Sequence, residues 1–166
     1  MIVKGTTMTP LPALLSRRDT LALLGATSLG IGLATAGDAP PEILVHRDPS
    51  CGCCGAWVEH VRRAGFPVKI VETGDLNAVK QRLDVPANLL SCHTAEVQGY
   101  VIEGHVPVAA IQSLLRDKPN AAGLAVPGMP VGSPGMEGGA PETYEVVLFG
   151  PHGQQTFTRY RGSQEI

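Results

Sequence analysis

The stretch that decides the fold spans residues 43–61 and reads ILVHRDPSCGCCGAWVEHV. Its opening residues, 43–46, predict a strand, because Asp48-Pro49 is a turn signal that bounds them. From about Cys54 to Ala64, apolar side chains recur at helical spacing with charged side chains opposite, and Gly65 ends this predicted helix. The stretch therefore predicts a strand, a cysteine-rich turn and a helix.

The residues that follow repeat this order. Residues 67–71 predict a second strand, and Asp75 is a good N-cap for a second helix that ends at Val85-Pro86. Alternating strands and helices predict a parallel βαβ core with a right-handed crossover. The remaining predicted elements are a strand at 97–102, a helix beginning at Pro107, a long Gly/Pro loop over 121–141, and a hairpin formed by 143–149 and 155–160.

The N-terminal 36 residues are typical of an export signal. Lys4, Arg17 and Arg18 precede an apolar run over residues 21–34, and Ala34-Thr35-Ala36 is typical of a cleavage site. Ser16-Arg17-Arg18 resembles a twin-arginine signal, although Thr20 and Ala22 replace its usual aromatic and basic residues. The general export route and an uncleaved membrane anchor are the alternatives.

This interpretation divides the chain into a signal (1–36), a linker (37–42) and one domain (43–166) in the periplasm. The chain has 166 residues, 17% of them charged, and a net charge of −2, which suits one globular domain. A net charge so close to zero does not indicate the positive surface that binding to nucleic acid or to an anionic membrane requires. We therefore expect no nucleic-acid partner, and no membrane partner once the signal is removed.

The four cysteines, Cys51, Cys53, Cys54 and Cys92, all belong to the predicted domain. Three of them lie between the first strand and the first helix, where unpaired backbone N–H groups and the helix dipole favour thiolates. A thiolate is both a nucleophile and a metal ligand. The position and the spacing together therefore predict a chemically active cluster.

Three interpretations of this cluster remain open. Structural disulfides are the first, but adjacent Cys53 and Cys54 cannot bridge without strain, and at most one sulfur of the turn can reach Cys92. A thioredoxin-like redox pair of Cys51 and Cys54 is the second, although Cys53 is unusual for a plain dithiol. A soft-metal site is the third and the favoured one, because clustered thiolates select Cu(I).

Two methionines and two histidines complete the candidate site. Met129 and Met136 lie in the Gly/Pro loop, where thioethers could fold over a thiolate cluster; the alternative is that they anchor the loop to the core. His93 follows Cys92 directly, and His105 lies in Gly104-His105-Val106. Each histidine is either a ligand or a hydrogen-bonded structural group.

Three ordered blocks resemble the small periplasmic CopG-type copper-resistance proteins. CGCCGAWV at 51–58 resembles the hallmark of that family. The other two blocks are CHTA at 92–95 with GYVIEGHVP at 99–107, and GLAVPGMP at 123–130 with GSPGME at 132–137. With the closing hairpin, the resemblance covers residues 43–161. His46 and Arg47 stand where the family more often has an aromatic residue and a lysine.

The resemblance implies an α/β, thioredoxin-like fold, in which a central mixed sheet is flanked by helices and carries a long Gly/Pro loop. It implies copper binding, as Cu(I) and with more than one ion allowed, and partners among copper-export or copper-resistance proteins. Pro130 is expected to be the cis-proline that faces the motif. Carried over by position, the metal ligands are Cys51, Cys53, Cys54, Cys92, Met129, Met136, His93 and His105.

The expected function is Cu(I) sequestration that contributes to copper resistance. Two alternatives belong to other classes of protein. One is a thiol-disulfide or copper oxidoreductase that uses the Cys51/Cys54 pair, with Cys51 as nucleophile. The other is a scaffold that docks to a copper pump or sensor.

Overall fold

The computed structural model describes residues 39–166, so the predicted export signal lies outside the described residues. The elements in chain order are β1 (Ile43–Arg47), α1 (Gly52–Arg63), β2 (Val68–Glu72), α2 (Leu76–Arg82), a 3-10 turn η1 (Ala87–Leu89), β3 (His93–Val97), β4 (Tyr100–Glu103), α3 (Val108–Asp117), β5 (Gly123–Ala125), β6 (Thr143–Gly150), β7 (Gly153–Arg161) and β8 (Gln164–Glu165).

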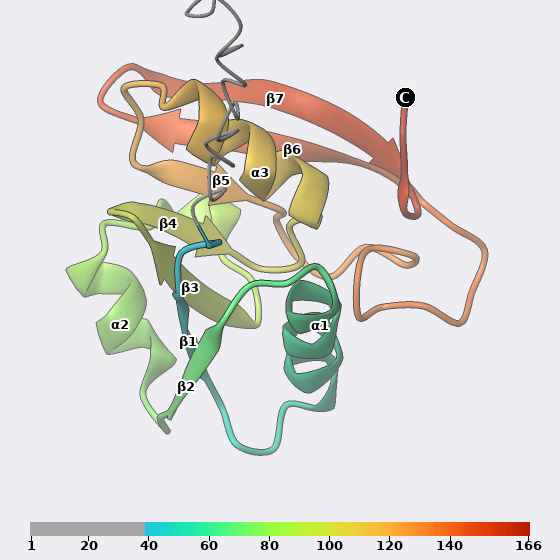
Figure 1. Cartoon of the computed structure of the whole chain (residues 1–166), viewed down its shortest axis with the longest axis horizontal. Helices are drawn as coiled ribbons and strands as arrows, with labels where there is room; N and C mark the ends of the chain where they lie inside the picture. Colours follow the sequence, from blue (N-terminus) through green and yellow to red (C-terminus); the bar gives the residue numbers. More distant parts are fainter. Residues whose placement is uncertain (1–38) are drawn as a thin grey trace, which may run out of the picture. The chain divides into compact units, whose positions relative to one another are not determined.

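The described strands form one mixed sheet in the order β2-β1-β3-β4-β5-β6-β7-β8 (Figure 1). β1 pairs in parallel with β2 across α1, which confirms the predicted βαβ unit. β4 pairs in parallel with β5, and the other neighbouring strands are antiparallel. The predicted α/β class with a central mixed sheet is therefore confirmed.

Two apolar clusters cover the two faces of this sheet, because successive strand residues point to opposite sides. On one face, Ile102 and Leu124 join the cluster that contains Trp57 of α1 and Leu114 of α3. On the other face, the strand neighbours of these two residues belong to a smaller cluster that also includes residues of the segment after α2. The buried members of this cluster are Leu89, Val101, Ala125 and Phe149. Helices α1 and α3 thus pack on one side of the sheet.

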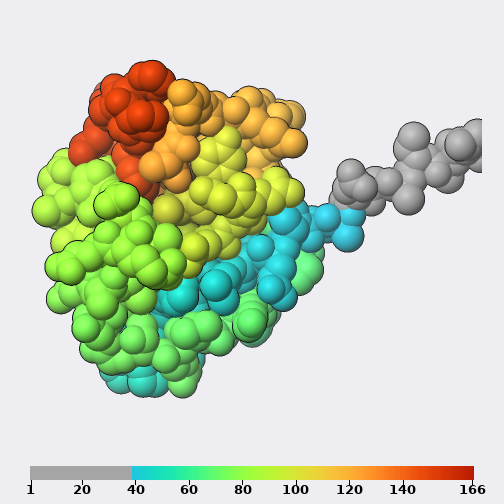
Figure 2. Space-filling model, turned by 90° about the vertical axis from the view of Figure 1, so that its left-hand side faces the viewer, coloured from blue at the N-terminus to red at the C-terminus, as the bar shows by residue number. Residues whose placement is uncertain are grey.

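Figure 2 shows the side of the molecule on which α2 and the segment after it, in green, reach the surface. The turn of the β6–β7 hairpin lies beside that segment. Two hydrogen bonds connect them, because the amides of Asn88 and Gln154 donate to each other at 2.8 and 3.1 Å. The predicted hairpin is therefore present and is attached to the body of the domain at its turn.

One predicted element was wrong. Residues 97–102 do not form a single strand; β3 and β4 form a hairpin with Gln98 and Gly99 at its turn. Both turn residues have positive φ, 47° and 84°, which is typical of the two-residue turns that match the twist of paired strands. The Gly/Pro loop also contains a strand that the sequence did not predict, β5, which pairs with β4 and β6.

The pairing register brings four chain segments to one end of the sheet. Arg47, the last residue of β1, pairs with His93, the first residue of β3. Glu103, the last residue of β4, pairs with Thr94 of β3 and with Ala125, the last residue of β5. The segments after β1, before β3, after β4 and after β5 therefore leave the sheet together, and they carry the cysteines and His105.

A buried ion pair connects α2 to this end of the sheet. Glu103 is 0% exposed, and its carboxylate accepts from Lys80 Nζ at 2.6 Å and from Thr94 Oγ1 at 2.7 Å. Lys80 Nζ also donates to Thr94 Oγ1 at 2.8 Å. Burial raises the pKa of Glu103, and the Lys80 ammonium opposes this shift. Removing one member of such a pair leaves the other charge buried and uncompensated.

We expect Glu103→Ala to lower the free energy of unfolding by about 3–5 kcal/mol, because the Lys80 ammonium loses its buried counter-charge. Chemical denaturation followed by circular dichroism measures this loss. The matched control is Glu145→Ala, which breaks an exposed ion pair with Arg159 and should leave the unfolding free energy nearly unchanged. Equal losses in the two variants would contradict the role of burial.

Candidate metal centre

Four sulfur atoms meet at this end of the sheet. The Sγ atoms of Cys51, Cys53, Cys54 and Cys92 all lie within 4.8 Å of one another. Cys51 is the N-cap of α1, Cys53 and Cys54 belong to its first turn, and Cys92 comes directly before β3. The structure thus brings together all four predicted cysteine ligands.

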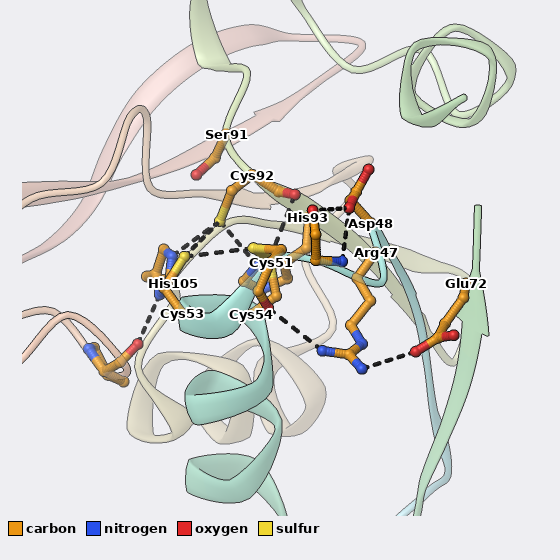
Figure 3. Close-up of a disulfide and its surroundings, with 12 residues drawn as sticks. Arg47, Asp48, Cys51, Cys53, Cys54, Glu72, Ser91, Cys92, His93 and His105 are labelled. Atoms are coloured by element: carbon orange, nitrogen blue, oxygen red, sulfur yellow. Dashed lines mark hydrogen bonds and ion pairs between the residues drawn. A yellow bond between two sulfur atoms is a disulfide. The ribbon is translucent and has the colours of Figure 1, made fainter. Parts of the chain in front are cut away.

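The cluster is partly oxidised. Cys51 and Cys54 form a disulfide, whereas Cys53 and Cys92 are free thiols (Figure 3). Cys53 Sγ lies 3.5 Å from Cys51 Sγ and 3.9 Å from Cys92 Sγ. The CxxC pair of the redox interpretation is therefore connected in this state, and Cys53 lies between the disulfide and the fourth cysteine.

Both histidines contact Cys92. His105 Nε2 lies 3.0 Å and His93 Nδ1 lies 3.3 Å from Cys92 Sγ. His105 Nδ1 lies 2.7 Å from the carbonyl oxygen of Pro134, which can only accept, so Nδ1 carries the hydrogen and Nε2 carries a lone pair. Cys92, His93 and His105 thus form a second group of ligand atoms within 4.8 Å, and Cys92 belongs to both groups.

Burial keeps this part of the site uncharged. It lowers the pKa of His93 well below the ordinary range, with help from the neighbouring His105, and it also lowers the pKa of His105. Burial and the nearby Cys53 raise the pKa of the Cys92 thiol to about 12. The expectation of thiolates at the helix N-terminus concerns the three cysteines of the turn. Cys92 lies outside the helix, and its thiol stays protonated at neutral pH.

Arg47 connects the start of the cysteine motif to the end of β2. Its Nη1 donates to the Cys51 carbonyl at 3.4 Å, and its Nη2 forms an ion pair with Glu72 at 2.8 Å (Figure 3). A Cβ on Gly55 would lie 3.4 Å from Nη1, an ordinary van der Waals distance, so the guanidinium packs against the first turn of α1. Arg47 thus fixes the backbone at the start of the cysteine motif.

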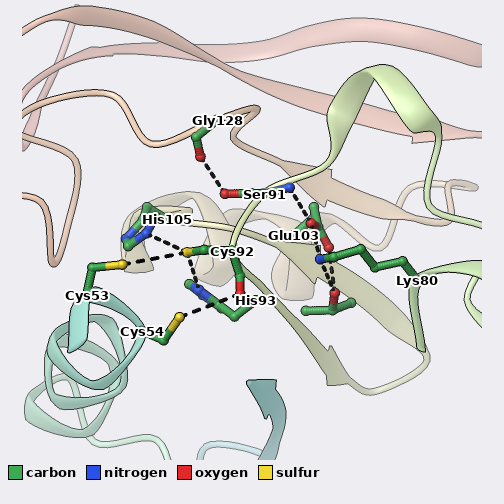
Figure 4. Close-up of polar contacts among 10 residues, drawn as sticks. Cys53, Cys54, Lys80, Ser91, Cys92, His93, Glu103, His105 and Gly128 are labelled. Atoms are coloured by element: carbon green, nitrogen blue, oxygen red, sulfur yellow. Dashed lines mark hydrogen bonds and ion pairs between the residues drawn. The ribbon is translucent and has the colours of Figure 1, made fainter. Parts of the chain in front are cut away.

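The segment that carries Cys92 is held by the buried ion pair. The Ser91 backbone N–H donates to the Glu103 carboxylate at 2.6 Å, and the Ser91 hydroxyl donates to the Gly128 carbonyl (Figure 4). Glu103, Lys80 and Ser91 were not predicted as site residues. An acidic residue inside the apolar run Val101-Ile102-Glu103 was a usable signal, because a buried carboxylate needs a partner.

The Gly/Pro loop lies against the first turn of α1. Pro134 accepts from His105, and Gly135 has a φ of 87° with the backbone of Cys53 and Trp57 close beside it. Met136 is half-buried, whereas Met129 is 51% exposed. The predicted role of the two methionines as metal ligands stays a prediction.

The expected cis bond at Pro130 was wrong, because residues 39–166 contain no cis peptide bond. Pro130 instead begins a tight turn, in which its carbonyl accepts from the backbone N–H of Ser133 at 3.1 Å and from the Ser133 hydroxyl at 2.7 Å. This turn directs the chain back towards Pro134 and α1. Its function is to seat the loop on the helix.

Fold and site together define a class of protein: an α/β domain that carries a cysteine–histidine cluster at one end of its sheet. Two solved structures of a copper resistance protein, CopG, in forms 2 and 1, resemble this chain at 46% sequence identity with a TM-score of 0.69. They cover 73% and 74% of this chain, and the match spans 98% and 99% of the solved chains.

The chain belongs to the CopG family of copper resistance proteins. A family model described as a protein of unknown function, DUF411, matches residues 89–136, which include Cys92, both histidines and both loop methionines. Among curated proteins, no sequence matches the chain. Within the described part of the chain, no helix combines the length and the apolar character that crossing a membrane requires.

We expect the Cys92 thiol to react slowly with iodoacetamide at pH 7–8, because a pKa of about 12 leaves almost no thiolate. Its alkylation rate should still rise about tenfold per pH unit between pH 8 and 10. Mass spectrometry of the tryptic peptide of residues 83–116 measures this rate. Cys53→Ser should accelerate the reaction, because Cys53 raises the pKa; a rate that levels off below pH 9 would contradict the shift.

Gly135→Ala should separate the loop from α1. A Cβ at this position would lie 2.7 Å from Trp57 N and 2.9 Å from the Cys53 carbonyl oxygen. Gly138 is the matched control, since its φ is also positive, at 122°, but its Cβ would meet nothing within 4 Å. Gly135→Ala should cost about 1–3 kcal/mol more unfolding free energy than Gly138→Ala, measured by denaturation. Equal costs would mean that the close approach is unimportant.

Proposed function

We propose that this protein binds copper as Cu(I) through its cysteine cluster and thereby contributes to copper resistance. The observation that carries the proposal is the meeting of four cysteine sulfurs within 4.8 Å. Thiolates are soft ligands that select Cu(I), whereas carboxylates, which suit Mg²⁺ and Ca²⁺, are absent from both ligand groups found in the described residues. The names of the two solved relatives support the same metal.

The donor set also suits more than one ion. Cys92 belongs both to the sulfur group and to the group with His93 and His105, so its thiolate can bridge two coppers. The lone pair of His105 Nε2 already points at Cys92, and His93 Nε2 is buried without a hydrogen-bond partner. A buried polar atom without a partner is unfavourable unless a ligand satisfies it. Met129 and Met136 would shield the bound metal from water.

Copper binding requires a change of redox state. The sulfurs of Cys51 and Cys54 are joined in the disulfide and cannot both act as thiolates. Two electrons must therefore enter the cluster before all four sulfurs can bind Cu(I). We infer that the oxidised form holds copper weakly and that the reduced form is the one that sequesters it.

The fold that we propose is thioredoxin-like. The strand order β2-β1-β3-β4, with β1 and β2 parallel and β3 antiparallel to both neighbours, supports this assignment. We also propose that residues 1–36 are an export signal, that residues 37–42 are a linker, and that the domain works in the periplasm beside copper-export or copper-resistance proteins. The sequence pattern of the signal supports this location.

A second candidate function is a thiol-disulfide or copper oxidoreductase. The Cys51–Cys54 disulfide at the N-terminus of a helix favours it, since this position promotes thiolate formation and exchange. Turnover in an insulin-reduction or copper-reduction assay supports this function. Consumption of thiols without turnover supports sequestration.

The test is anaerobic titration of the purified, fully reduced protein with Cu(I) against a competing chelator. We expect tight binding of one or more coppers and protection of all four thiols from alkylation. Cys53→Ser should bind fewer coppers, with an affinity lower by about tenfold or more, because it removes the central sulfur while leaving the CxxC pair intact.

The matched controls are the oxidised protein and the surface variant Ser163→Ala. Ser163 is exposed in the turn between β7 and β8. Oxidised protein should bind less copper, and Ser163→Ala should bind as the unmodified chain does. Weak binding by the reduced protein, together with a readily reduced Cys51–Cys54 disulfide, would reject sequestration in favour of the oxidoreductase.

A further inference from the structure

The four sulfurs form a connected path. One end is the Cys51–Cys54 disulfide, and the other end is the Cys92 thiol (Figure 3). The Cys53 thiol lies between them, with its Sγ 3.5 Å from Cys51 Sγ and 3.9 Å from Cys92 Sγ. The disulfide is therefore adjacent to one free thiol, which is in turn adjacent to a second.

The second thiol has a base beside it. His105 Nε2 carries a lone pair and lies 3.0 Å from Cys92 Sγ (Figure 4). The Pro134 carbonyl orients the ring through Nδ1 at 2.7 Å. His105 Nε2 can therefore accept the proton as the Cys92 sulfur attacks, although burial keeps this thiol protonated at rest. Copper binding uses both side chains as ligands but does not explain this proton path.

We propose that the metal-free cluster moves its disulfide from Cys51–Cys54 to Cys53–Cys92 by internal thiol–disulfide exchange. In the first step, the Cys53 thiolate attacks Cys51 Sγ. The Cys51–Cys53 bond forms, the Cys51–Cys54 bond breaks, and Cys54 leaves as a thiolate that takes up the proton lost by Cys53.

In the second step, Cys92 gives its proton to His105 Nε2 and attacks Cys53 Sγ. The Cys53–Cys92 bond forms, the Cys51–Cys53 bond breaks, and Cys51 leaves as a thiolate that receives the proton from His105. One disulfide and two thiols are present before and after, so the sequence needs neither an oxidant nor a reductant.

The start of α1 permits the intermediate. Cys51 occupies the N-cap without a side-chain hydrogen bond to the helix, and Gly52 and Gly55 flank the sulfurs. An uncapped first turn opens more easily than a capped one. The two isomers differ in their free thiols: one has the thiols of Cys53 and Cys92, and the other has those of Cys51 and Cys54, of which Cys54 is fully buried.

The experiment follows the disulfide in the copper-free protein, which is held under argon with a chelator and contains one disulfide. Protein stored at pH 4, where thiols are protonated and exchange stops, is moved to pH 7.5, and samples are quenched with N-ethylmaleimide over hours. Trypsin then yields residues 48–62, with three cysteines, and residues 83–116, with Cys92. We expect the two peptides to become disulfide-linked, with Cys51 and Cys54 alkylated.

Two variants test the two steps. Cys53→Ser should slow formation of linked peptides by about tenfold or more, because the central thiol is absent. His105→Gln should slow the approach to equilibrium by about tenfold or more, because it removes the base that takes the Cys92 proton. His152→Gln is the matched control, since His152 is exposed in the β6–β7 turn and should leave the rate unchanged.

Absence of the linked peptides in the unmodified chain after a day overturns the proposal, and this readout needs no variant to fold. Linked peptides that form equally fast in Cys53→Ser overturn the path through Cys53. An unchanged rate in His105→Gln overturns the assignment of the base. Copper is absent throughout, so these outcomes are independent of whether the proposed Cu(I) binding is correct.

Discussion

The carboxylate of Glu103 is the group on which the site depends. Burying a charge in a protein is costly unless it is paired and hydrogen-bonded, and Glu103 meets this requirement through Lys80, Thr94 and the Ser91 backbone N–H. These donors come from α2, from β3 and from the segment before Cys92. A single buried acceptor therefore determines the distance between a helix, the sheet and the cysteine-bearing segment.

The same geometry explains why distant parts of the sequence meet in one site. Cys92 is 38 residues from Cys54, yet the Cys54 sulfur lies 3.6 Å from the Cys92 carbonyl oxygen. The antiparallel pairing of β1 with β3 aligns the end of one strand with the start of the other. β4 then delivers His105 to the same end, and the loop after β5 returns to orient its ring through Pro134.

Local patterns predicted much of this arrangement. Asp75 was recognised as an N-cap and accepts from the Ala78 N–H at 3.0 Å, because capping is a short-range interaction. The β3–β4 turn was missed since Gln98 is not a common residue at positive φ. Pairs such as Lys80 with Glu103, and His105 with Pro134, could not be predicted, because each joins positions more than twenty residues apart and has no local signature.

The groups of the cluster whose charge state the structure indicates are neutral. Burial keeps the Cys92 thiol protonated and His93 uncharged, and the disulfide removes two further potential anions. Each of these states avoids placing negative charge in a poorly solvated site. A bound cation reverses that preference, since it compensates thiolates that water cannot reach. The disulfide and the proposed Cu(I) site are thus alternative ways for the same sulfurs to satisfy one electrostatic constraint, and in this proposal the redox state of the surroundings decides which of them the cluster adopts.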